Sequence, residues 1–230
     1  MEFLLLIQDR RGEAQRVPVG AEEMGKFARE LAELGVLRGA GGPLRPEGEG
    51  ARVRVGSGGA SVREGAPLAD APGVVGGYFV VDVPDRAAAV ELAKRCPYAR
   101  AGFVEVRAMQ FWRRDEGASP RFVFLYLWGP ELTGPDEPRI AEMRAFAQVL
   151  TAERKLVGGA RLPPEVPPAR VEVRGHDVLV TDGPFAETKE IIAGFALIDA
   201  RDRAEALELA KRVPHARWDT VVVRELARPS

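Results

Sequence analysis

Val90-Glu-Leu-Ala-Lys-Arg-Cys-Pro-Tyr-Ala-Arg100 is repeated almost letter for letter 117 positions later, as Leu207-Glu-Leu-Ala-Lys-Arg-Val-Pro-His-Ala-Arg217. The same shift relates Gly77–Asp82 to Gly194–Asp199. Matches at one fixed spacing in two separate blocks indicate an internal duplication.

The duplication sets the expected domain boundaries. Ala51–Val55 matches Ala169–Val173 at a shift of 118, so one residue was gained or lost between the blocks. We expect two homologous domains, residues 1–110 and 122–230. The charged segment 111–121, which contains Gly and Pro, is expected to be the linker.

Each half shows the same order of patterns: an apolar run, a helical period, Gly-rich turns with short strands, a strand, a helix and a last strand. This β-α-β-hairpin-β-α-β order predicts the α+β class, with two ferredoxin-like domains in which helices cover one face of an antiparallel sheet. Asp85 and Asp202 are expected to cap the second helices, and Glu205 completes a capping-box pattern.

The opening strands indicate how the sheets pack. Phe3–Ile7 and Phe122–Leu127 are apolar at nearly every position, so both faces of each strand should be buried. Because helices cover one face, we expect the other faces of the two sheets to pack together. The result would be a dimeric α/β barrel formed as an intrachain pseudo-dimer, which can pair again into a homodimer.

Composition excludes several classes of protein. The 230 residues are 46% hydrophobic and 29% charged, too apolar for disorder, and the net charge of −1 gives no electrostatic reason to expect nucleic acid. The single cysteine, Cys96, excludes an internal disulfide or a multi-cysteine metal site, and we expect it to be a small buried hydrophobe.

No stretch approaches the ~18 apolar residues of a membrane span. We expect a cytoplasmic protein whose first residues form a strand and not a signal peptide. The Arg, Ala, Gly and Pro richness is typical of a GC-rich bacterial genome.

One segment of the second half is distinctive. Asp182-Gly-Pro-Phe185 is followed by Ala-Glu-Thr-Lys-Glu190, then by Gly194-Phe195 and Asp199. This pattern resembles the YCII-related (DGPF) family, and the first half resembles a diverged copy. The resemblance implies the dimeric ferredoxin-like fold, an enzyme role based on a His/Asp pair in a cleft, and for some relatives a gene next to a stress-type sigma factor.

Asp182 has two interpretations. Asp-Gly-Pro is a turn former, so the carboxylate can simply close an Asx-turn. Alternatively the turn holds the carboxylate at the mouth of a cleft as base, orienter or ligand acceptor. In the first half either Glu64 or Gly65 corresponds to Asp182, depending on where the gap is placed. The motif is altered in both alignments, so two equivalent sites are not expected.

His215 is the second catalytic candidate, as a general acid or base beside Asp182 or another acid. It follows Pro214 at the end of a helix, where a C-terminus favours imidazolium, and the alternative is a partly exposed capping residue. His176 is expected at a solvated hairpin tip, so the two histidines exclude a His-rich metal site and leave open only one assisted by carboxylates; we predict no metal site.

Four further residues are candidate ligand contacts. Glu187 and Lys189 would flank the cleft, where Lys189 can neutralise an anion, although together with Glu190 they also fit an exposed charged run. Arg161 would line the same cleft. Tyr126 is expected either to point its hydroxyl between the two sheets or to be buried with a hydrogen-bond partner.

The sequence leaves three functional hypotheses open. The first is a small-molecule site in the second half with cofactor-free acid–base chemistry on a small, anionic metabolite. The second is a non-catalytic ligand-binding or regulatory module linked to a stress-type sigma factor. The third is a structural duplicate in which the turn only maintains the fold.

Overall fold

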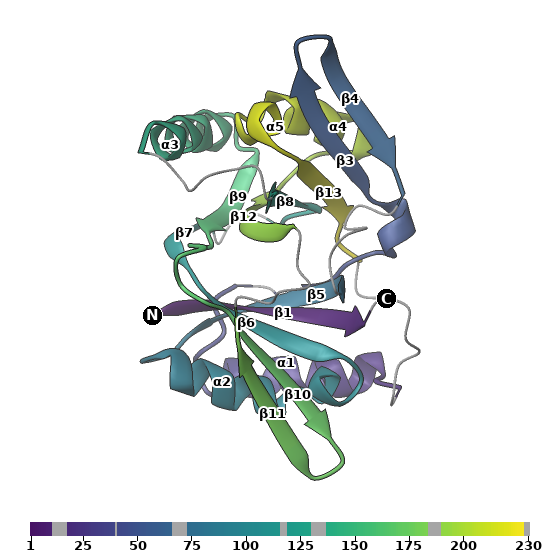
Figure 1. The fold of residues 1–230 in the computed structure, drawn as a ribbon, viewed down its shortest axis with the longest axis vertical. Coiled ribbons are helices and arrows are strands. Elements are labelled where there is room, and N and C mark those ends of the chain that lie inside the picture. The colour runs from purple at the N-terminus through teal and green to yellow at the C-terminus, as the bar shows by residue number, and fades with distance from the viewer. Residues whose placement is uncertain are drawn as a thin grey trace. The chain divides into compact units, whose positions relative to one another are not determined.

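A computed structural model describes residues 1–10, 18–39, 41–65, 73–115, 119–129, 137–183 and 190–227 (Figure 1). The chain divides into two compact units. Unit 1 comprises residues 1–43, 71–110 and 165–188, and unit 2 comprises residues 44–70, 111–164 and 189–230. Each unit therefore contains segments from both sequence repeats.

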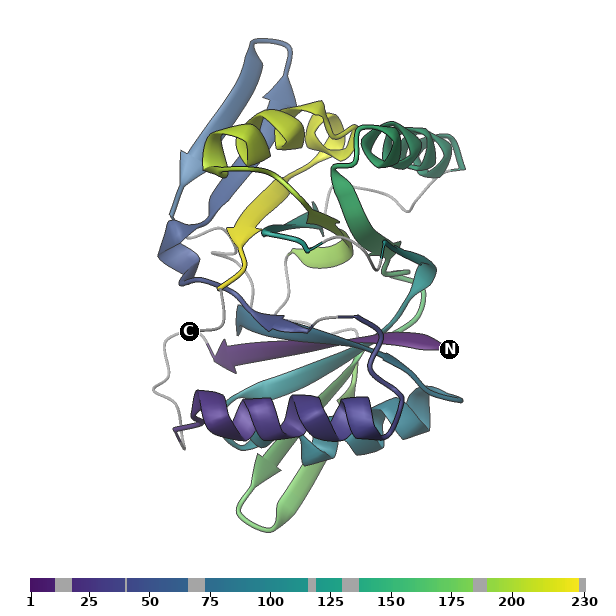
Figure 2. The same ribbon diagram turned by 180° about the vertical axis from the view of Figure 1, so that it is seen from behind.

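Unit 1 is a six-stranded sheet with strand order β11-β10-β6-β1-β5-β2. The core strands β6, β1, β5 and β2 are antiparallel neighbours, as in a ferredoxin-like sheet. Helices α1 and α2 cover one face, as Figure 2 shows for α1. The elements are β1 (Glu2–Arg10), α1 (Ala21–Glu33), β2 (Gly42–Pro43), β5 (Gly73–Asp82), α2 (Arg86–Arg95), the 3-10 helix η2 (Pro97–Arg100), β6 (Phe103–Ala108), β10 (Ala169–Arg174) and β11 (Asp177–Asp182).

Unit 2 repeats this plan in a seven-stranded sheet with the order β4-β3-β13-β8-β12-β9-β7. Its ferredoxin-like core is β13, β8, β12 and β9. The elements are the 3-10 helix η1 (Glu47–Glu49), β3 (Ala51–Gly56), β4 (Gly59–Glu64), β7 (Gln110–Arg114), β8 (Phe122–Trp128), α3 (Glu137–Ala152), β9 (Leu156–Arg161), β12 (Ile191–Ile198), α4 (Arg203–Arg212), α5 (His215–Trp218) and β13 (Val221–Glu225).

The two repeats exchange their hairpins. Strand β10 of the second repeat pairs with β6 of the first, with Ala169 opposite Val106. Reciprocally, β3 of the first repeat pairs with β13 of the second, with Ala51 opposite Val223. Figure 1 shows the green β10–β11 hairpin beside β6 and the blue β3–β4 hairpin beside the yellow β13. The compact units thus alternate along the sequence, and the boundary expected at 111–121 stays a prediction.

The first residues of the segment expected to be a linker form strand β7. Strand β7 is hydrogen-bonded at the edge of the sheet beside β9, and the Asp115 N–H donates to the Val157 carbonyl at 2.6 Å. Its Phe111 and Trp112 are large apolar side chains of the kind that pack against neighbouring strands.

The α+β class and the two ferredoxin-like units are confirmed. Every side chain from Phe3 to Ile7 is buried, as the unbroken apolar run predicted. Phe3, Leu5 and Ile7 belong to the cluster under the helices, so Leu4 and Leu6 occupy the opposite face and are buried there. The face-to-face packing of the two sheets stays a prediction.

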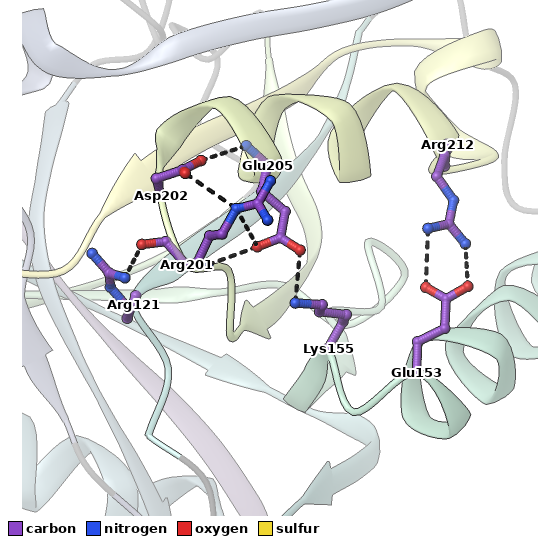
Figure 3. A network of polar contacts seen from close by, with 7 residues as sticks. All are labelled: Arg121, Glu153, Lys155, Arg201, Asp202, Glu205 and Arg212. Carbon is purple, nitrogen blue, oxygen red and sulfur yellow. Dashed lines mark hydrogen bonds and ion pairs between the residues drawn. The ribbon is translucent and has the colours of Figure 1, made fainter.

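The second helices begin as the sequence predicts. Asp85 and Asp202 each accept a hydrogen bond from the backbone N–H three residues on, at 2.9 and 2.8 Å. The Glu205 carboxylate accepts a hydrogen bond at 2.8 Å from the backbone N–H of Arg201, which is one residue before the N-cap residue that a capping box would use. Glu205 also pairs with Lys155 at 2.7 Å (Figure 3). The Glu205 N–H bond holds the pKa of Asp202 below its usual value, and the Lys155 contact does so for Glu205.

Candidate functional site

Unit 2 contains a cavity of about 450 Å³ between α3 and the sheet. Its walls come from α3, α5 and strands β7, β8, β9 and β12, and most of them are apolar or aromatic. A small number of polar groups in a largely apolar cavity of this volume is typical of small-molecule sites. The aromatic residues of the wall are Phe111, Trp112, Tyr126, Trp128, Phe146, Phe195 and Trp218, and its polar ones include Arg139, Arg144, Arg161 and His215.

Comparison of the repeats explains why the space is open. In unit 1, Phe79 on β5 is buried and its ring meets the edge of Phe27 from α1 at a centroid distance of 5.4 Å. Phe79 lies opposite Leu5, and the corresponding strand position in unit 2, opposite Phe124, is Ala196. Ala196 lines the cavity and has no ring to fill it.

His215 is part of the cavity wall. It begins the four-residue α5 and is buried, and its Nε2 is 2.6 Å from the carbonyl oxygen of Leu127. Because a carbonyl can only accept, Nε2 carries the proton and Nδ1 has the free lone pair of a neutral imidazole. Burial lowers the pKa of His215, Arg139 lowers it further, and Leu127 and Asp219 act in the opposite direction. The expectation that a helix C-terminus favours imidazolium here is therefore wrong: desolvation outweighs it.

Tyr126 and Arg161 reach the same cavity as His215. The Tyr126 ring lies 5.5 Å from the His215 ring, and burial raises the pKa of its hydroxyl. Tyr126 packs with Phe122 and Phe124 against the helix-side cluster, so it faces the helices and not the space between the sheets, contrary to the first of its two interpretations. Arg161 ends β9 opposite Gly194, where a Cβ would come within 2.9 Å of a backbone oxygen.

Asp182 belongs to unit 1 and is not among the residues of this cavity wall. It ends the exchanged strand β11, where its exposed carboxylate accepts a hydrogen bond from Arg86, the first residue of α2. Glu64 ends β4 in the same register and pairs with Arg203, the first residue of α4. Of the two alignments, the one that matches Glu64 with Asp182 is the structural correspondence. The pairing of Asp182 with His215 as catalytic residues stays a prediction.

Comparison with known proteins places the chain in a family. The YCII-related domain matches residues 1–113 and again residues 122–228. The chain belongs to the YCII-related family. It is also 36% identical over 85 residues to a protein of Rhizobium meliloti (strain 1021) named only as uncharacterized, a match that covers 37% of this chain and 68% of that protein. The tandem arrangement deduced from the repeat is confirmed, and the family adds no assigned reaction.

The YCII signature of the second repeat ends in a partly buried ion pair that the sequence did not predict. Glu187 and Lys189 lie outside the described residues. Glu190, expected in an exposed charged run, is only partly exposed and accepts two hydrogen bonds from Arg52 of the exchanged hairpin, with Nη1 to Oε2 at 2.9 Å. Arg52 also donates to the hydroxyl of Thr220 at 3.3 Å. This contact joins the signature to β3, which arrives from the other repeat.

Two further predictions about reactive groups can be compared with the structure. Cys96 is buried, and desolvation raises the pKa of its thiol to about 12, so it is the inert hydrophobe that was expected. Among the described residues, no group of three His, Cys, Asp or Glu side chains could hold a metal ion.

In the described part of the chain, no helix combines the length and apolar character that a membrane crossing requires.

Sequence reasoning missed the arginines of α3 and the clustering of the tryptophans. The chain has three tryptophans, Trp112, Trp128 and Trp218, and all of them line the cavity. The signal was available in the repeats, because two paired positions differ sharply in size: Phe79 against Ala196, and Ala101 against Trp218.

The stability of this YCII-related chain is expected to decrease as the pH falls from about 6.5 to 5.5, and His215→Gln should remove that dependence. Unfolded histidine has a pKa near 6.5, whereas the folded value is lower, so the unfolded state binds more protons in this window. The slope is at most about 1.4 kcal/mol per pH unit. Carboxylates with lowered pKa values titrate below this range, and the other histidine, His176, is exposed. Urea unfolding at several pH values measures the effect, and parallel profiles for the two proteins would contradict it.

Proposed function

We propose that this chain binds a small, largely apolar molecule in the unit 2 cavity. The observation that carries the proposal is the volume of about 450 Å³ lined by aromatic side chains where the other repeat places the Phe79 ring. Spaces of this size are few in a well-packed domain, because the lining atoms lose packing contacts that a bound apolar molecule would restore. Met143 and Phe146 on the inner side of α3 are only half-buried and provide apolar surface for a ligand.

The test uses N-phenyl-1-naphthylamine, an uncharged dye that fluoresces in apolar surroundings. Binding should quench tryptophan emission and saturate at one dye per chain, because all three tryptophans line the cavity. Ala196→Phe should weaken binding at least tenfold by placing a ring where the dye would lie. Ala145→Phe is the matched control, since Ala145 is exposed on α3 and does not belong to the wall. Equal binding by wild type and Ala196→Phe would overturn the proposal, as would failure of wild type to bind this dye and the two naphthalene probes described below.

Acid–base catalysis is a second candidate function, and the tautomer of His215 favours it. With Nε2–H donated to Leu127, a neutral Nδ1 is available as a general base beside a ligand-sized space. The lowered pKa keeps the imidazole unprotonated at neutral pH. Consumption of a cavity ligand found in a metabolite screen would establish an enzyme, whereas return of that ligand unchanged would establish a carrier or a regulatory module.

A further inference from the structure

The charged groups among the described residues of the cavity wall have one sign. These residues include three arginines, Arg139 and Arg144 on α3 and Arg161 on β9, and no aspartate or glutamate. Its histidine is neutral for the reasons given above. A largely apolar space whose charged groups are all guanidinium is suited to a ligand that carries the opposite charge, since such groups bind carboxylates in bidentate fashion.

Arg139 is the arginine of the wall whose positive charge lowers the pKa of His215. It lies in the first turn of α3, and its guanidinium carbon is 5.7 Å from the centre of the Trp218 ring on α5. The Trp218 ring lies in turn 6.0 Å from the His215 ring, and the charge of Arg139 lowers the pKa of His215, so Arg139, Trp218 and His215 form one part of the wall. Arg139 is half-buried, so an anion beside it is less screened by water than an anion at the surface.

Arg144 occupies a different position. Its guanidinium carbon lies 4.2 Å from the centre of the Phe111 ring, its side chain is about half exposed, and Glu137 is 3.6 Å away. An exposed guanidinium next to a carboxylate contributes little to affinity for an anion. Arg144 is therefore better suited to attract an anion to the cavity than to hold it.

We propose that the cavity ligand is a small aromatic or aliphatic carboxylate whose anionic group is bound by Arg139 beside Trp218 and His215, with its apolar body against the aromatic wall. This inference rests on the proposed function and assigns the chemical class of the ligand. Arg139 is accordingly the residue that determines specificity, and Arg161 from the sheet side adds to the positive potential.

The experiment compares 2-naphthoate with 2-naphthamide, which share a ring system and size but differ in charge. Tryptophan quenching should show naphthoate binding at least tenfold more tightly than the amide. Arg139→Gln should weaken naphthoate about tenfold to a hundredfold and leave the amide unchanged, as expected for the loss of a hydrogen bond to a charged group. Arg217→Gln is the matched control, because Arg217 is exposed on α5, pairs with Glu142 and does not line the cavity.

The outcomes separate the two proposals. Equal affinities for the two probes, both lost in Ala196→Phe, would overturn the carboxylate assignment and leave the cavity as an apolar site. A preference for naphthoate that survives in Arg139→Gln would overturn the role of Arg139. Failure of both probes and of the uncharged dye to bind would overturn the proposed function itself. Circular dichroism spectra of each variant confirm that a loss of binding is not a loss of folding.

Discussion

Replacing Glu190 with glutamine is expected to lower the free energy of unfolding by about 3 kcal/mol. The side chains of Glu190 and Arg52 are only 12% and 18% exposed, and two hydrogen bonds join them. Glutamine keeps the size of the side chain but removes the carboxylate that faces the guanidinium, so a mostly desolvated positive charge remains in place. The effect should be large because this contact connects β12 to the hairpin contributed by the other repeat. Urea unfolding followed by far-ultraviolet circular dichroism measures it.

Two control variants distinguish a charge effect from a packing effect. The double variant Arg52→Met with Glu190→Met should lie within about 1 kcal/mol of wild type, because apolar residues of similar size replace a buried pair with little loss. Asp182→Asn at the exposed pair with Arg86 should also cost no more than about 1 kcal/mol. If Glu190→Gln unfolds at the same urea concentration as wild type, the pair does not hold the hairpin in place.

Local patterns predicted the elements but could not predict the exchange of hairpins. Hydrophobic periodicity and the Asp85 and Asp202 caps depend on residues close in sequence, and they identified the order of strands and helices. The hairpins are copies of one another, and their edges offer the same register, Ala169 to Val106 and Ala51 to Val223. The two hairpins place their apolar side chains on the same alternate positions, so either hairpin could pair with the edge of either sheet. The sequence alone does not show which hairpin pairs with which sheet.

The site was only partly predictable for a related reason. The signature drew attention to Asp182, whose carboxylate pairs with Arg86, while Tyr126, Arg161 and His215 were identified and do line one cavity. The cavity lies where Ala196 takes the position of Phe79, and such a difference in side-chain volume is visible only when the two repeats are compared. Glu190 was misjudged because its partner Arg52 lies 138 residues away and reaches it through the hairpin exchange.

The reciprocal substitution in unit 1, Phe79→Ala, is expected to cost about 3–4 kcal/mol of stability. Phe79 is 7% exposed, its ring packs edge-on against Phe27, and it lies so close to Gly41 that a Cβ there would come within 2.2 Å of the ring. Removing the ring leaves a void over a glycine that has no side chain to move into it. Urea unfolding measures the loss, and a cost below about 1 kcal/mol would show that α1 collapses onto the sheet.

The same variant tests whether the ring at this position decides which repeat has a cavity. Phe79→Ala should bind a second molecule of N-phenyl-1-naphthylamine, and Phe79→Ala combined with Ala196→Phe should bind one molecule in unit 1. All three tryptophans belong to unit 2, so the dye should quench tryptophan emission less in the double variant than in wild type. A double variant that binds no dye would show that the aromatic wall of unit 2, and not the absence of one ring, creates the site. A double variant that binds one dye with weak quenching would show that a single position, occupied by phenylalanine in one repeat and alanine in the other, determines where the duplicated fold holds its ligand.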